Sequence, residues 1–243
     1  MANNFPKSLE KDLVAEAVFE IRFKSSFPEE ALAGLLYNHY KDSVSNGLEK
    51  LPHLQVPELI RKQDPNLQFM PLYRISMGNL IIQIGSNNVS LINSGSGSYL
   101  GWNKFFEKIK SFVSVTIKIT AVSEFTRCSL RYIDFLEQDV ADVCNISLNN
   151  SIKYDRKQIC NTEIYRNGDF HIKTTMATEV ILENSIDGKK LKGSIIDTDV
   201  SLEMNLPETE LPANINKMHD IAKEVFFSLL KPEFTTELGP KYE

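Results

Sequence analysis

Polar and apolar residues alternate along residues 15–23, a stretch that reads AEAVFEIRF. Phe19 and Ile21 stand on one side of the alternation, and Glu20 and Arg22 stand on the other. A period of two residues, with Phe and Ile at this density, predicts a half-buried β-strand rather than a helix. The exposed face of such a strand therefore explains most of the charged residues in this stretch.

The pattern changes to helical spacing after Pro28, where apolar residues recur every three or four positions as far as Tyr40. Proline followed by two acids is typical of a helix start, so we predict a helix over about residues 28–44. Residues 46–66 contain three prolines and are predicted to form a connecting loop. Three short apolar stretches separated by turn residues then predict an antiparallel meander over residues 67–77, 79–86 and 88–94.

Residues 102–116 carry their large apolar side chains on one helical face and predict a long amphipathic helix. The second half of the chain repeats this outline. A strand over residues 126–137 is followed by a polar segment to about residue 157 and by a final helix at about residues 212–231. Between them, strands are predicted near residues 158–166, 169–184 and 192–206, with turns at 166–169 and 187–188.

This order of elements predicts the α+β fold class, with two similar halves at residues 1–120 and 121–243. Each half is expected to place an antiparallel sheet against a long helix in a β-α-β-β-β-α-like order, because a sheet covers its buried face. The match between the halves is short, AVFEIRF against CSLRYIDF, so duplication is a hypothesis. One sheet per half and one continuous sheet shared by both halves fit the pattern equally well.

The composition is that of an ordinary globular protein, with 42% hydrophobic and 24% charged residues in a chain of 243. The 27 basic and 32 acidic residues give a net charge of −5, which offers no sign of a nucleic-acid surface, although a local basic patch stays open. No apolar run approaches the roughly 20 residues of a membrane span, and residues 1–13 lack the apolar core of a signal peptide. We therefore expect a cytoplasmic protein with no membrane contact.

Motifs for a metal or a cofactor do not occur. The three cysteines have no CxxC pairing and the four histidines have no HxxxH or HExxH spacing, so we expect no disulfide framework, no metal site and no cofactor. A loop before the second long helix is a weak candidate for anion binding, because such loops can direct N–H groups at an anion. This loop consists of Gly95, Ser96, Gly97 and Ser98. It lacks the P-loop lysine and the dinucleotide spacing, so a flexible turn is the favoured interpretation.

A second set of polar residues interrupts the strand predicted over residues 126–137. Together with the charges of the first strand, it could form a polar cleft between the two halves. The candidate polar cluster consists of Glu20, Arg22, Arg131, Tyr132 and Asp134. Cross-strand ion pairs on a solvated face, worth about 0.2–1 kcal/mol each, explain the same residues without chemistry, and we favour that explanation.

Nucleophilic catalysis needs a base beside the nucleophile, and no GxSxG elbow or Cys-His signature occurs in the chain. We therefore expect a non-enzymatic binding or interaction protein with a protein partner. Two alternatives stay open, an enzyme or small-ligand-binding protein that uses the polar cleft, and a nucleic-acid-binding module. The nucleic-acid alternative requires several residues to share one surface: Lys104, Lys108, Lys110, Lys118 and Arg127 with Trp102 or Phe105. A homodimer through an exposed strand edge also stays open.

Four stretches carry motifs of a known family, and they are spread over nearly the whole chain: EAVFEIRF, YLGW, LRYIDFL and FFSLLKPEFTTELGP. They resemble a sporadically distributed family of uncharacterised prokaryotic proteins. The residues that match its motifs are Glu16, Ala17, Val18, Glu20, Arg22, Phe23, Tyr99, Gly101, Trp102, Arg131 and Tyr132. Asp134 departs from the pattern, because a different polar residue, often Asn, is expected there. The resemblance implies no activity or catalytic residue, and the family's patchy distribution implies a context such as prokaryotic defence or toxin neutralisation.

Overall fold

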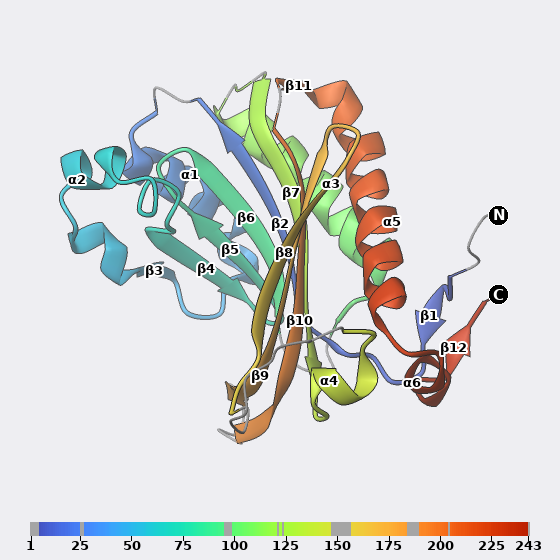
Figure 1. Cartoon of the computed structure of the whole chain (residues 1–243). Helices are drawn as coiled ribbons and strands as arrows, with labels where there is room; N and C mark the ends of the chain where they lie inside the picture. The colour runs from blue at the N-terminus through green and yellow to red at the C-terminus, as the bar shows by residue number, and fades with distance from the viewer. Residues whose placement is uncertain are drawn as a thin grey trace.

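Most strands of the protein form one ten-stranded antiparallel sheet (Figure 1). The computed structural model describes residues 5–24, 27–94, 99–120, 122, 124–146, 157–183, 190–203 and 205–242. The strands of the sheet follow the order β3-β4-β5-β6-β2-β7-β10-β9-β8, and β11 pairs with β7 beside this path. Their bounds are β2 Val14–Phe23, β3 Leu48–Lys50, β4 Tyr73–Met77, β5 Leu80–Ile84, β6 Asn88–Ser94, β7 Glu124–Leu136, β8 Cys160–Asn167, β9 Phe170–Glu183, β10 Lys190–Leu202 and β11 Leu206–Pro207.

Helices cover one face of this sheet, with α3 and α5 lying along its centre (Figure 1). The α-helices are α1 Glu29–Tyr40, α2 Glu58–Gln63, α3 Trp102–Thr120, α4 Val140–Val143, α5 Leu211–Leu229 and α6 Pro232–Glu237. Short 3-10 turns occupy Lys41–Ser43, Pro52–Gln55 and Glu208–Glu210. The fold class predicted from the sequence, an α+β protein with antiparallel strands and a long helix packed on a sheet, is confirmed.

The alternation in β2 explains how the core forms. Every second residue of this strand is buried, and Phe19 and Ile21 are fully enclosed. On the helix side they belong to one hydrophobic core with Leu36 of α1, Phe112 of α3 and Met218 of α5. Because successive side chains of a strand point to opposite faces, the same alternation sends the polar residues of β2 to the uncovered face.

The main strands of residues 1–120 and of residues 121–243 follow the same order outward from the centre of one shared sheet. In the first half β4, β5 and β6 lead to β2, and in the second half β8, β9 and β10 lead to β7. The strands β2 and β7 are antiparallel neighbours at the centre, so the open question of one sheet or two is answered by a single continuous sheet. This mirrored order is the arrangement that a duplication would produce.

The segment predicted as a loop at residues 46–66 contains β3 and α2 instead. The helix α2 is anchored by a polar contact that hydrophobic spacing does not reveal. Arg61 is only 5% exposed, and its guanidinium binds the Glu29 carboxylate of α1 through two hydrogen bonds of 2.6 and 3.0 Å. Ser86 donates a further hydrogen bond of 2.6 Å to the same carboxylate. A buried ion pair between distant residues therefore orders this segment.

The N-terminal segment runs across the end of α5 before it enters the sheet. Its short strand β1 (Ser8–Leu9) pairs with β12 (Pro240–Lys241) near the C-terminus (Figure 1). The backbone N–H groups of Glu10 and Lys11 donate to Leu238 O at 3.0 and 3.1 Å. This pairing fixes residues 6–14 against the helix side of the molecule.

Candidate functional site

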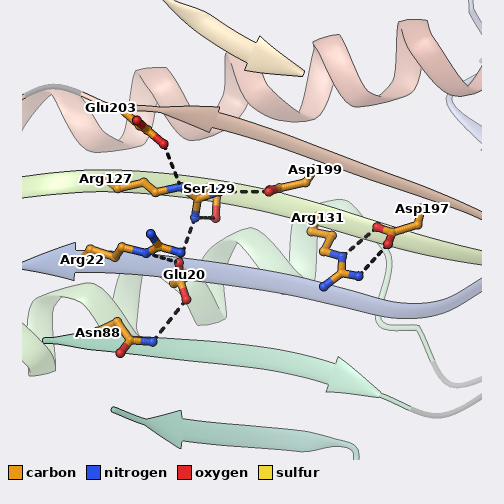
Figure 2. Close-up of polar contacts among 9 residues, drawn as sticks. All are labelled: Glu20, Arg22, Asn88, Arg127, Ser129, Arg131, Asp197, Asp199 and Glu203. Carbon is orange, nitrogen blue, oxygen red and sulfur yellow. Dashed lines mark hydrogen bonds and ion pairs between the residues drawn. The ribbon is translucent and has the colours of Figure 1, made fainter. Parts of the chain in front are cut away.

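The uncovered face of the sheet carries a network of charged residues where the two halves meet (Figure 2). Arg22 of β2 and Arg127 of β7 are directly opposite in the strand register, which places like charges together. Glu20 offsets their repulsion, because its Oε1 accepts hydrogen bonds from Arg22 Nε and from Arg127 Nη1, both at 2.8 Å. Asn88 of β6 donates from Nδ2 to the other carboxylate oxygen of Glu20 at 3.2 Å.

Arg127 extends this network to β10. Its Nη2 donates to Asp199 Oδ2 at 2.9 Å, and its Nη1 donates to Ser129 Oγ at 2.7 Å. Its Nε lies 3.6 Å from the Glu203 carboxylate. The Arg127 side chain is 12% exposed, so these contacts satisfy a largely buried guanidinium.

A second ion pair lies on the same face, between Arg131 of β7 and Asp197 of β10 (Figure 2). It is bidentate, with Nε to Oδ1 at 2.7 Å and Nη2 to Oδ2 at 2.5 Å. The hydrogen bond to Asp197 raises the pKa of Arg131, which keeps it charged. The guanidiniums and carboxylates in Figure 2 thus bind one another, and they join β2, β7 and β10 in a fixed register.

The candidate polar cluster of the sequence is divided between the two faces of the sheet. Glu20 and Arg22 form an ion pair on the uncovered face, and Arg131 lies on that face with a different partner. Tyr132 and Asp134 lie on the helix side, because they alternate with Arg131 along β7. The five residues therefore do not share one cleft. The weak candidate loop of Gly95, Ser96, Gly97 and Ser98 lies outside the described residues.

A pocket of about 200 Å³ lies on the helix side, and we call it the Asp134 pocket. Its floor comes from β7 and β10, its walls come from the start of α3 and the second half of α5, and residues 6–14 line its remaining side. Both halves of the chain therefore contribute to it. Its lining is mainly apolar and aromatic, as in most small-molecule sites.

Three aromatic residues form a hydrogen-bonded chain along this pocket. The Tyr132 hydroxyl lies 3.3 Å from the Tyr99 hydroxyl and 3.0 Å from Nδ1 of His219. The His219 ring stacks on Trp102 with centroids 4.0 Å apart and an interplanar angle of 7°. Burial lowers the pKa of His219 to about 4, with help from the nearby Lys223, so the imidazole is neutral at pH 7.

Asp134 lies in the floor of the pocket and is 5% exposed. Within the described part of the chain, its carboxyl has no hydrogen bond and no ion pair. Burial, followed by repulsion from Asp12 and Asp197, raises the pKa of Asp134 to about 8. The neighbouring Thr198 hydroxyl is also buried without a partner among the described residues. Buried polar groups are ordinarily hydrogen-bonded, so this floor offers unused capacity to a ligand.

Two lysines line the same pocket away from this carboxyl. Lys7 belongs to the N-terminal segment, and Lys223 lies one helical turn after His219 on α5. The pKa of Lys223 is lowered mainly by burial; Asp220 opposes this shift, and Lys7 adds a smaller lowering. Among the described residues, no carboxylate lies within ion-pair distance of either ammonium group. The pocket therefore combines an unpaired acid with two unpaired bases.

Other chemistry has less support in the described residues. They contain no group of three or more His, Cys, Asp or Glu residues that could hold a metal ion. Burial raises the pKa of the Cys128 thiol to about 12, which leaves it protonated and unreactive at neutral pH. None of the helices in the described ranges has the length and apolar character needed to cross a membrane.

The basic residues of the nucleic-acid alternative are divided between the two faces of the sheet. Arg127 is bound to carboxylates on the uncovered face, whereas Lys104 and Lys108 are exposed on α3 on the helix side. Phe105 is fully buried, and Trp102 is stacked between His219 and Phe106. The stacking platform and phosphate contacts that this alternative requires are therefore not assembled by these residues.

Sequence reasoning missed Asp12, Lys223 and the part of His219 in this pocket. A usable signal was the parity of β7, because Asp134 alternates in step with Leu130 and Leu136 and should share their buried face. A carboxyl predicted on a buried face is a candidate site by itself. The distant residues that complete the pocket carry no such signal.

Comparison with known proteins leaves the resemblance noted above as a prediction. No protein-family model matches the chain, and no curated protein is significantly similar to it in sequence.

Proposed function

We propose that the protein binds a small organic molecule in the Asp134 pocket. The observation that carries this proposal is the Asp134 carboxyl, which is 5% exposed, has no partner among the described residues, and faces a cavity of about 200 Å³. A buried carboxyl without a partner costs stability, and perturbed acids in a cavity are typical of functional sites. A ligand that supplies a hydrogen-bond donor or a cation would offset this cost.

The aromatic residues around the carboxyl support binding rather than catalysis. No serine, threonine or cysteine in the described lining is hydrogen-bonded to a histidine, which is the arrangement that activates a nucleophile. The one histidine of the lining, His219, is held by Tyr132 and by its stack on Trp102. A protein partner in a defence or toxin-neutralising context stays a prediction, because no observation on the described residues identifies it.

The test uses a built-in reporter, since Trp102 is the only tryptophan of the chain and lines the pocket. A set of small amines, carboxylic acids, amino acids and amides is screened by ligand-observed NMR and by Trp102 fluorescence. We expect at least one class to bind the native protein. Ala222→Phe adds a ring to a cavity-lining position of α5 and should abolish that binding.

Ser228→Phe is the matched control, because it adds the same ring to an exposed position of the same helix. It should bind like the native protein. Asp134→Leu is the second test if Ala222→Phe does not fold, since it removes the carboxyl and keeps a side chain of similar size, and it should also abolish binding. The proposal is overturned if no compound binds, or if binding survives both Ala222→Phe and Asp134→Leu.

A further inference from the structure

Two acidic and two basic side chains line the Asp134 pocket, and the effects of each on its neighbour group them into an acidic side and a basic side. Asp134 and Asp12 form the acidic side, and they are close enough for Asp12 to raise the pKa of Asp134. Lys7 and Lys223 form the basic side, and they are close enough for Lys7 to lower the pKa of Lys223. Like charges are therefore neighbours on each side.

The two sides do not neutralise each other. No ion pair joins Asp12 or Asp134 to Lys7 or Lys223 in the described residues, although all four line one pocket. Asp12 and Lys7 are exposed and solvated, whereas Asp134 is buried and Lys223 is half-buried. A buried carboxyl that a cation would ionise and a lysine without an ion-pair partner in the described residues are together complementary to a ligand that carries both a cation and an anion.

The residues between the two sides are neutral and mostly apolar. His219 is uncharged at pH 7 and lies between Tyr132 and Trp102, while Phe226 and Phe227 continue the apolar wall on α5. A pocket of about 200 Å³ is small beside the roughly 300–1,000 Å³ of most ligand sites. The body of the ligand is therefore small and apolar.

We infer that the ligand of the Asp134 pocket is a small zwitterion, with an ammonium group at Asp134 and Asp12 and a carboxylate or similar anion at Lys7 and Lys223. A free amino acid with an apolar side chain has this chemistry. This inference rests on the proposed function and names the class of ligand. The ammonium group supplies the partner that the Asp134 carboxyl lacks.

The experiment compares three matched forms of the same molecule. L-Leucine, L-methionine and L-phenylalanine are each titrated beside their amides, which keep only the ammonium group, and their deaminated acids, which keep only the carboxylate. Trp102 fluorescence and calorimetry report Kd. At least one zwitterion should bind about tenfold or more tightly than both of its singly charged forms.

Two substitutions assign the two ends. Lys223→Met should lower the affinity for the zwitterion to that for its amide, and the affinity for the amide should not change. Asp134→Asn should lower the affinity for the zwitterion to that for its deaminated acid, and the affinity for the acid should not change. Lys217→Met removes an exposed lysine of the same helix outside the pocket and should change none of these affinities.

The inference is overturned if an amide or a deaminated acid binds as tightly as its zwitterion, or if no zwitterion binds at millimolar concentration. If another compound of the screen then binds the native protein and not Ala222→Phe, the proposed function stands and only the class of ligand is wrong. If nothing binds, both are wrong.

Discussion

The Asp134 carboxyl should make the stability of the protein fall as pH rises. Its pKa is about 8 in the folded protein against an ordinary value of 3.8, and the cause is first its burial. Between these two pH values the unfolded chain has lost the proton while the folded protein keeps it. The unfolded state therefore binds fewer protons, and the free energy of unfolding decreases by about 1.4 kcal/mol per pH unit.

His219 acts in the opposite direction over part of this range. Its pKa is lowered from 6.5 to about 4, so the unfolded chain binds more protons there between those values, and stability rises with pH. The two effects partly cancel below about pH 6.5, and the Asp134 effect is left above it. The difference in free energy of unfolding between Asp134→Asn and the native protein isolates the Asp134 effect, because His219 is present in both and its contribution cancels.

Asp134→Asn should therefore be more stable than the native protein at neutral pH, by up to roughly 4 kcal/mol at pH 7. This gain in the free energy of unfolding over the native protein should become steadily smaller as the pH is lowered towards about 5. Urea unfolding at several pH values measures it, and Asp169→Asn, at an exposed turn, is the control with no such trend. A constant difference between Asp134→Asn and the native protein over this range would show that Asp134 is ionised in the folded protein, and the reasoning would be refuted.

Three further substitutions test the packing and the charge network by chemical unfolding. Thr174→Val removes a buried hydroxyl that has no partner among the described residues and should raise stability by about 1 kcal/mol, whereas Thr116→Val loses a hydrogen bond of 2.9 Å and should not. Glu20→Gln removes the carboxylate between two arginines that lie opposite each other and should lower the free energy of unfolding by about 2 kcal/mol. Glu49→Gln, from an exposed ion pair, is the control, and an equal loss of stability in both variants would contradict this prediction. Gly193→Ala would place its Cβ within 2.1 Å of a carbonyl oxygen of β7 and should cost about 2 kcal/mol; an unchanged midpoint would show that the strand shifts freely.

The fold class could be predicted because its signals are local. The period of two in residues 15–23 and the apolar face of residues 102–116 are visible in short windows, and both elements occur close to the predicted bounds. The pairing of β2 with β7 joins residues more than a hundred positions apart, as in the register of Glu20 with Ser129. No local pattern carries that information, so a single sheet and two separate sheets could not be distinguished.

The candidate site was only partly accessible for a related reason. Three polar residues of β7, Arg131, Tyr132 and Asp134, were grouped by their closeness in sequence. In a strand, however, neighbours face opposite sides, so sequence distance and spatial distance disagree. The residues that complete the pocket of Asp134 are Asp12 from the N-terminal segment and His219 and Lys223 from the last long helix, and only tertiary structure brings them to the same pocket.

Asp134 connects the stability of the protein to its proposed function. A sequence selected only for stability would place an apolar residue at this position, because the carboxyl is buried and has no partner in the described chain. Residues that destabilise the fold at their position are expected where function requires them. A ligand ammonium group would favour the ionised carboxylate, so binding would release the proton that the empty pocket holds. The carboxyl whose burial destabilises the free protein would then stabilise the complex, and affinity would increase with pH up to about 8.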